Sequence, residues 1–212
     1  IFTVCVTEQE IKQPQKETLI DAVLVILLIM AGFVAVTVFL TKAIVRLIYT
    51  DAMTQVRNKT AYNECVDLLS KRIRDKEQLD FLIAVVDIND LKIVNDTYGH
   101  EYGDKLIQNG ASILKKVWGS DCTYRTGGDE FVIVCSDMEM KCAKERISLF
   151  EEAIEAYNRQ NTCEELFLQM AIGMAVYSSE TDKEYMDVFR RADSAMYEDK
   201  KQKKEKRRIV DF

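Results

Sequence analysis

The chain has 212 residues, of which 29 are basic and 35 are acidic, and 48% of its residues are hydrophobic. This length and apolar content suit one full-sized domain with an appendage. The acidic balance, with one basic run near the C-terminus, argues against a nucleic-acid-binding protein. The six cysteines show no C-x-x-C spacing, which disfavours a zinc site or a disulfide framework and predicts reduced, partly buried thiols.

Residues 22–40, AVLVILLIMAGFVAVTVFL, form an uncharged run that is long enough to cross a bilayer at about 1.5 Å per residue. The alternatives are a buried core helix and a signal peptide, but no small-residue cleavage site follows the run. Basic residues are more frequent after the run than before it: Lys42, Arg46, Arg57 and Lys59 against Lys12 and Lys16. We therefore expect a single-pass protein of the cell inner (cytoplasmic) membrane, with a truncated extracytoplasmic tail at 1–17, a span at 18–41 and the remainder in the cytoplasm.

A helical linker is predicted at 42–51, where Ile44, Leu47 and Ile48 form an apolar stripe. No Pro-, Gly- or Ser-rich segment follows it, so we expect a stiff connection to a domain at 52–212. Asn58 is a suitable N-cap for a helix that ends near Lys76.

Residues 79–88, LDFLIAVVDI, predict a strand that is apolar on both faces, as in the middle of a covered sheet. The strand ends in Asp87, and Asn89 and Asp90 follow it. Buried charge must be paired or bound to a metal, so an acid at this position indicates a site.

The segment from Cys122 to Cys135, CTYRTGGDEFVIVC, predicts a β-hairpin with its turn at Gly127 and Gly128, because glycine tolerates positive φ. Asp129 and Glu130 follow the turn, at the mouth of an apolar strand. Taken alone, these acids suit a solvated hairpin tip equally well. The second acidic strand end, at Asp87, favours a functional site.

Further elements are expected as helices at 91–98, 104–118, 139–160 and 183–203, a loop at 99–103 and a strand at 166–177. An antiparallel hairpin mixed with helices favours an α+β sandwich, with helices packed on a central sheet. The basic tail at 200–208 is interpreted as a solvated helix end, with nucleic acid or anionic lipid as alternative partners. Helical spacing brings Lys200 and Lys204 to one face, where both could reach a phosphate chain.

Asp87 and Asp129 can lie side by side if their strands are neighbours in the sheet. Converging carboxylates without His or Cys favour a hard cation such as Mg²⁺. The sole histidine, His100, has no second His or Cys near it in the sequence, and neither a P-loop nor a nucleophile motif is present. Because paired carboxylates with two Mg²⁺ can activate a hydroxyl group, the residues predict Mg²⁺-dependent phosphoryl or nucleotidyl transfer.

Residues 51–212 resemble the GGDEF domain family, the diguanylate cyclases, which condense two GTP molecules into cyclic di-GMP and two pyrophosphates. Four segments in order carry the resemblance: DAMTQVRNKTAY at 51–62, VVDINDLKIVNDTYGHEYGD at 85–104, RTGGDEF at 125–131 and RRADSAMYEDKKQKK at 190–204. The resemblance implies a palm-like βαββαβ sheet. It also implies a homodimer, because each domain binds one GTP and product forms only between two facing domains.

The resemblance further implies residue roles. Two Mg²⁺, or Mn²⁺ in their place, would be held by Asp87, the Ile88 carbonyl, Asp129 and Glu130. Asp129 or Glu130 would help to deprotonate the attacking ribose 3′-hydroxyl. Asn95 and Asp104 would bind the guanine edge. The phosphates would be held by Lys92, Lys200, Lys204 and the backbone amides of Asp90 and Leu91.

Met53, Gln55 and Val56 depart from the family's entry segment, and two further departures bear on activity and its control. Asn89 stands where a second Asp is frequent, but the adjacent ligands are intact, so we expect activity. Trp118 replaces the arginine of the family's inhibitory R-x-x-D motif, although Asp121 is present, so we expect no tight product inhibition. Trp118 either covers the end of its helix or stacks on a guanine. The alternative function is an inactive GGDEF domain that senses GTP or docks a partner; the retained acids favour catalysis.

Overall fold

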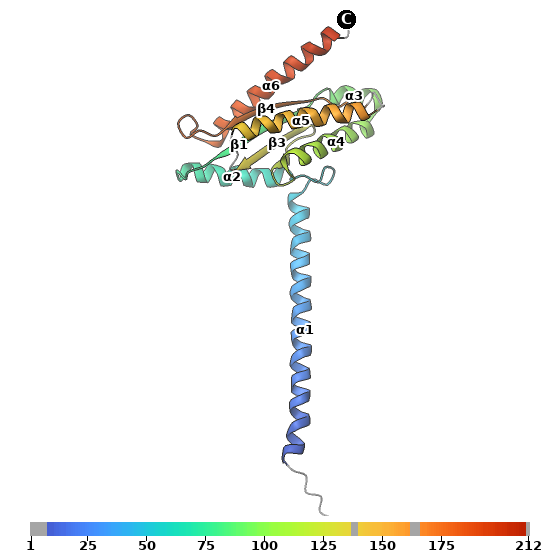
Figure 1. The fold of residues 1–212 in the computed structure, drawn as a ribbon, viewed down its shortest axis with the longest axis vertical. Helices are drawn as coiled ribbons and strands as arrows, with labels where there is room; N and C mark the ends of the chain where they lie inside the picture. The colour runs from blue at the N-terminus through green and yellow to red at the C-terminus, as the bar shows by residue number, and fades with distance from the viewer. Residues whose placement is uncertain (1–7, 137–139, 162–165, 211–212) are drawn as a thin grey trace, which may run out of the picture. The chain divides into compact units, whose positions relative to one another are not determined.

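The computed structural model describes residues 8–136, 140–161 and 166–210. The chain divides into two units, Ile1–Arg46 and Leu47–Phe212 (Figure 1). The first unit holds most of helix α1, Glu8–Tyr49, and Asp21–Tyr49 is long and apolar enough to cross a membrane. This helix extends beyond the predicted span in both directions, and residues 1–7 of the predicted tail lie outside the described residues.

The second unit is built on a four-stranded sheet in the order β2-β3-β1-β4, in which every neighbouring pair is antiparallel. The strands are β1 Phe81–Ile88, β2 Thr123–Arg125, β3 Glu130–Ser136 and β4 Met170–Val176. Every residue of β1 is buried, as the apolar sequence on both of its faces predicts. The predicted α+β fold with a βαββαβ order is confirmed.

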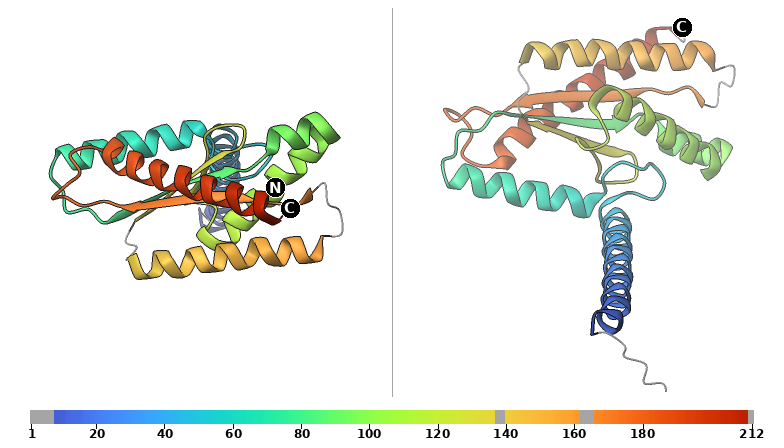
Figure 2. Two further views of the ribbon diagram at one scale, coloured as in Figure 1. Left: turned by 90° about the horizontal axis from the view of Figure 1, so that it is seen from above. Right: turned by 60° about the horizontal axis from the view of Figure 1, so that its bottom comes forward.

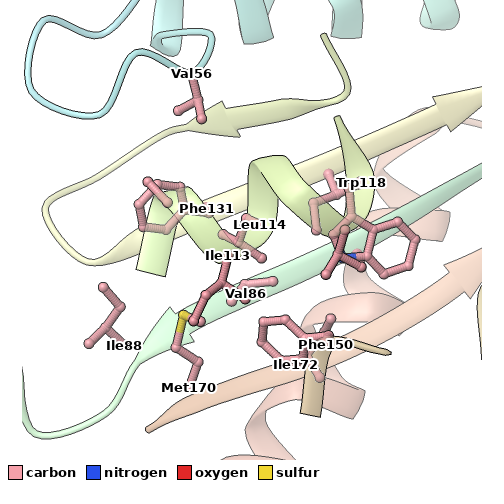
Figure 3. Packing of buried hydrophobic residues seen from close by; sticks show 14 of the residues in the cluster. Val56, Val86, Ile88, Ile113, Leu114, Trp118, Phe131, Phe150, Met170 and Ile172 are labelled. Atoms are coloured by element: carbon pink, nitrogen blue, oxygen red, sulfur yellow. The ribbon is translucent and has the colours of Figure 1, made fainter. Parts of the chain in front are cut away.

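Helices cover both faces of this sheet (Figure 2). Alternate residues of β1 point to opposite faces. Phe81, Ile83 and Val85 pack with helices α2, Lys59–Arg74, and α6, Tyr185–Val210. Leu82, Ala84, Val86 and Ile88 pack with helices α4, His100–Trp118, and α5, Met140–Gln160, in the cluster drawn in Figure 3. The short helix α3, Leu91–Tyr98, follows β1 directly.

Side chains occupy the outer edge of β4. Asn158 donates to the Leu168 carbonyl at 2.8 Å and accepts from its amide at 2.9 Å. Further along the strand, Lys203 donates to the Met170 carbonyl, Asp199 accepts from the Ile172 amide, and Arg191 donates to the Val176 carbonyl. At the opposite edge of the sheet, the backbone of Arg57 bonds to β2 through the Thr123 carbonyl and the Arg125 amide.

One local prediction is wrong. The segment 99–103 is not a loop: α3 ends at Tyr98, Gly99 follows with a φ of +93°, and α4 begins at His100. Gly103 lies inside α4, and a Cβ there would meet the Asn95 side chain on α3 at 1.9 Å. The predicted hairpin is confirmed, since β2 pairs with β3 and the Thr126 amide donates to the Glu130 carbonyl across Gly127 and Gly128, but neither glycine has a positive φ. The predicted N-cap is confirmed, since Asn58 accepts from the Ala61 amide at 3.1 Å.

Candidate functional site

The register of the sheet brings the two acidic strand ends together. Asp87 of β1 lies opposite Glu130 of β3, and the Ile88 amide donates to the Asp129 carbonyl at 3.1 Å. The two strands are neighbours, as the hypothesis of converging carboxylates required. The backbone hydrogen bonds between β1 and β3 fix this placement. Asp87, Ile88, Asp129 and Glu130 therefore lie together at one end of the two central strands.

Asp87 is a buried acid, with only 8% of its surface exposed. Its Oδ1 atom lies 2.5 Å from Nζ of Lys200, which reaches it from α6. Burial raises the pKa of the Asp87 carboxyl, the Lys200 ion pair opposes the rise, and the negative charge of Asp129 adds to it. Lys204 also lowers the pKa of Asp87, so two of the three predicted phosphate-binding lysines act electrostatically at this strand end.

The donor set suits a hard divalent cation, because it consists of carboxylate and carbonyl oxygens. Within the described residues, no three His, Cys, Asp or Glu side chains are already gathered to hold a metal. One physical reason for this arrangement of the acids is that Asp87 is already paired with the ammonium group of Lys200, which balances its charge. Glu130 is another: its carboxylate lies over Gly127, so that a Cβ added to Gly127 would be 2.7 Å from Oε2.

Asn89 offers a further oxygen beside this strand end. The residue is 5% exposed, and neither its Oδ1 nor its Nδ2 has a hydrogen-bond partner in the described part of the chain. Buried polar groups are normally paired, so an orphaned amide next to Asp87 fits a site that binds a polar ligand or an ion.

Arg125, for which the sequence predicted no role, supports the loop that carries Asp129. One guanidinium nitrogen donates to the Gly128 carbonyl at 2.9 Å, and another lies 3.1 Å from Oδ1 of Asp51. Asp51 also accepts from the amide and hydroxyl of Thr54. Burial alone would raise the pKa of the Asp51 carboxyl, but the bonds from Thr54 and Arg125 hold that pKa below its usual value. The available signal in the sequence was a basic residue directly before the hairpin loop, at the end of β2.

The residues predicted to bind guanine meet at the corner between α3 and α4. Asn95 of α3 lies against Gly103, which precedes Asp104. Its Oδ1 is buried and has no partner among the described residues, whereas Asp104 is exposed. The corner therefore presents an unpaired amide beside an exposed carboxylate, which is a polar arrangement able to bind the edge of a base.

Three of the predicted phosphate-binding residues, Asp90, Leu91 and Lys92, lie at the start of α3, whereas Lys200 and Lys204 lie on α6. Asp90 adopts the left-handed conformation with φ of +58°, and the helix begins at the next residue, Leu91. The first backbone amides of a helix lack intrahelical partners and favour anions. Lys92 follows in the first turn and is exposed to solvent. The start of α3 therefore offers amide donors and a flexible cation together.

Trp118 is part of the hydrophobic core and not of a surface site (Figure 3). Only 4% of its surface is exposed, and the Arg146 guanidinium lies 5.9 Å from the ring centroid. The ring cannot stack on a guanine from this position, so the interpretation as a helix-end cover is the one that fits. Asp121 is a surface acid, 87% exposed, that lies 3.4 Å from Arg57.

Known proteins resemble this chain in sequence. The family described as "Diguanylate cyclase, GGDEF domain" matches residues 48–206. Diguanylate cyclase DgcP of Pseudomonas aeruginosa is 31% identical over 153 residues, which cover 72% of this chain and 22% of that protein. Diguanylate cyclase DgcZ of Escherichia coli is 31% identical over 155 residues, covering 71% of this chain and 49% of the relative. The chain thus spans less than half the length of these relatives.

Solved structures agree in fold. The coiled coil and GGDEF domain of DgcB from Caulobacter crescentus, in complex with c-di-GMP, aligns with a TM-score of 0.64 at 24% identity. The alignment covers 90% of this chain and 96% of that one. The GGDEF domain of DgcB alone gives a TM-score of 0.62 at 23% identity, covering 73% of this chain and 91% of the other. With the family match over 48–206, these findings establish that the chain belongs to the GGDEF domain family of diguanylate cyclases.

Proposed function

We propose that the protein is a diguanylate cyclase, which condenses two GTP molecules into cyclic di-GMP and releases two pyrophosphates. The observation that carries the proposal is the register of β1 and β3, which brings Asp87 opposite Glu130 and bonds the Ile88 amide to Asp129. Two neighbouring strand ends that bear acids can hold the metal ions that stabilise the negative charge of reacting phosphates.

The chain's own residues have distinct tasks in this proposal. Asp87, Asp129, Glu130 and the Ile88 carbonyl hold two Mg²⁺, or Mn²⁺, which supply charge stabilisation at the phosphates when bound. Asp129 or Glu130 accepts the proton of the ribose 3′-hydroxyl that attacks the partner's GTP. Asn95 and Asp104 bind the guanine edge from the α3–α4 corner. The phosphates are held by Lys92, Lys200, Lys204 and the amides of Asp90 and Leu91.

Lys200 has to change partners in this scheme. Its ammonium group is bound to Asp87, 2.5 Å away. If Asp87 held a divalent cation, the cation would supply the counter-charge in place of Lys200, and the Lys200 side chain could then contact the phosphates. The same side chain would therefore serve either as the partner of Asp87 or as a contact to the substrate.

The proposal extends to assembly and location. Each domain binds one GTP, so two copies must face one another and the active form is a homodimer. The apolar helix Asp21–Tyr49 supports a single membrane span. The excess of basic residues after the apolar run supports a catalytic domain in the cytoplasm.

The test uses the full chain in detergent micelles, supplied with GTP and Mg²⁺, with cyclic di-GMP and pyrophosphate measured by chromatography and mass spectrometry. Specific activity should rise with protein concentration, because two domains must meet. A parallel dimerising helix fused before α1 should raise activity at low concentration. GTP binding without any product, in the presence of either metal, would favour a GTP-sensing or docking module and contradict the proposal.

A further inference from the structure

Two cysteines meet at the end of the β2–β3 hairpin that lies away from the Gly127–Gly128 loop. The Val134 amide donates to the Cys122 carbonyl at 2.9 Å, so Cys122, in the turn before β2, lies beside the residue that precedes Cys135 in β3. Both side chains pack against the same cluster, on the face of the sheet covered by α4 and α5. The two thiols are hydrogen-bonded to each other.

The two thiols differ in access to solvent. Cys122 is half-buried in the turn before β2, whereas Cys135 is 2% exposed inside β3. An oxidant arriving from solvent therefore meets Cys122 first. Cys135 lies deeper in the cluster against which Cys122 packs, which suits an attacking and a resolving thiol.

Charges around the pair favour the thiolate on Cys122. Its hydrogen bond from Cys135 and the nearby guanidinium groups of Arg146 and Arg57 lower the pKa of Cys122 to about 7, against the opposing effects of burial and of Asp121. The pKa of Cys135 is raised by the same hydrogen bond and by burial. Cys65 provides a comparison within the domain, because burial raises its pKa. The thiolate is the reactive form, so Cys122 differs in kind from the other buried thiols.

We propose that Cys122 and Cys135 form a reversible disulfide, which makes this end of the hairpin a site of oxidative modification by peroxide. The Cys122 thiolate attacks one peroxide oxygen, so that an S–O bond forms, the O–O bond breaks and hydroxide leaves. The Cys135 thiol then attacks the oxidised sulfur; the S–S bond forms, the S–O bond breaks, and water leaves with the thiol proton. Two thiols and one hydrogen peroxide yield one disulfide and two waters, and a low-molecular-weight thiol reverses the change.

The inference is independent of the proposed function, since it concerns thiol chemistry and not nucleotides. Resting thiols in a cytoplasmic domain are reduced, and disulfides formed there are transient and serve redox sensing. The bond would restrain the open end of a hairpin whose other end is closed by the Thr126 amide on the Glu130 carbonyl at 3.0 Å. Oxidation therefore acts on the hairpin that carries Asp129 and Glu130.

The test treats the reduced full chain in detergent with hydrogen peroxide, alkylates the remaining thiols and maps peptides by mass spectrometry. A linked pair of peptides containing Cys122 and Cys135 is expected, and dithiothreitol should release it. In Cys135→Ser, Cys122 should stop at the sulfenic acid and react with dimedone. In Cys122→Ser, Cys135 should stay reduced. The exposed Cys142 gives the matched control, since Cys142→Ser should leave the linked pair unchanged.

The rates sharpen the test. At pH 7, Cys122 should be alkylated roughly tenfold faster than Cys65, because a larger share of it is thiolate. Recovery of both alkylated cysteines from folded, peroxide-treated protein would overturn the proposal. So would accumulation of sulfinic acid on Cys122 in the unmutated chain, or linkage of Cys122 to another cysteine. If Cys135→Ser fails to fold, as judged by circular dichroism, peptide mapping of the unmutated chain decides.

Discussion

The proposed site has two halves, which the fold holds in place by different means. The metal-binding half lies at the end of β1 that carries Asp87, and the guanine-binding half lies at the corner between α3 and α4. At the first, the backbone ladder fixes Asp87 opposite Glu130, and the side chains are arranged by charge, with Lys200 paired to Asp87. At the second, no ladder exists, and Asn95 lies where it does because Gly103 leaves room for it. The first half should therefore be sensitive to lost charge, and the second to added volume or altered polarity.

The largest effect is expected from Asp87→Asn, which removes one metal-binding charge. Loss of several kcal/mol of charge stabilisation corresponds to a fall in cyclic di-GMP synthesis of about 10³-fold. The raised pKa of Asp87 means that its ionised form is disfavoured in the fold, so the neutral Asn variant should melt at the same or a higher temperature at pH 7. The exposed Asp121→Asn is the control. Near-normal turnover by Asp87→Asn would mean that charge does not govern this half.

Asp104→Ser tests the second half by changing polarity. A carboxylate accepts from the guanine N1–H and 2-amino groups, which adenine does not offer, so the unmutated enzyme should select GTP. The variant should lower the preference for GTP over ATP by about 10²-fold. Competition between GTP and ATP, with products resolved by mass, measures it. Equal use of both by the unmutated protein would refute the assignment.

Gly103→Ala tests the same corner by adding volume. The new methyl group would lie 1.9 Å from Oδ1 of Asn95, so the amide must move out of its position. We expect the KM for GTP to rise by about tenfold with a smaller change in kcat, because ground-state binding is lost. Gly32→Ala, where nothing lies within 4 Å of the added Cβ, is the control. An unchanged KM would show that Asn95 does not contact the base.

The smallest effect concerns the support of the first half. Asp51→Asn should lower the free energy of unfolding by about 1–2 kcal/mol at pH 7, since it weakens bonds to Arg125 and Thr54. The folded pKa of Asp51 is depressed, so its contribution is fully present above about pH 4 and is lost as pH falls through the folded value. Urea unfolding at several pH values measures this. The exposed Asp67→Asn on α2 is the control. If the loss of unfolding free energy caused by Asp51→Asn stayed constant down to pH 2, it would contradict the prediction.

The sequence predicted the parts of the molecule that depend on patterns repeated along the chain. Alternating and continuous apolar runs located β1, and the motifs located Asp87, Asn95, Asp104, Asp129 and Glu130. Two contacts could not be predicted from such patterns. Lys200 and Asp87 are 113 positions apart in the chain. Arg125 and Gly128 are only 3 positions apart, but their contact depends on the shape of the loop between them. Gly103 was misread as a loop residue, because its role depends on the neighbouring helix. The sequence shows that residue 103 is glycine, but not that the Asn95 side chain occupies the space beside it.

The occupied edge of β4 limits how two copies of the domain can meet. Sheets commonly join by adding strand to strand, which needs free amides and carbonyls along an edge. Here Asn158, Lys203, Asp199 and Arg191 already satisfy such groups at Leu168, Met170, Ile172 and Val176. These contacts disfavour strand-to-strand joining at β4, so we expect the proposed homodimer to assemble through side-chain surfaces that can separate and meet again. The same contacts reduce unwanted strand addition between copies of the domain.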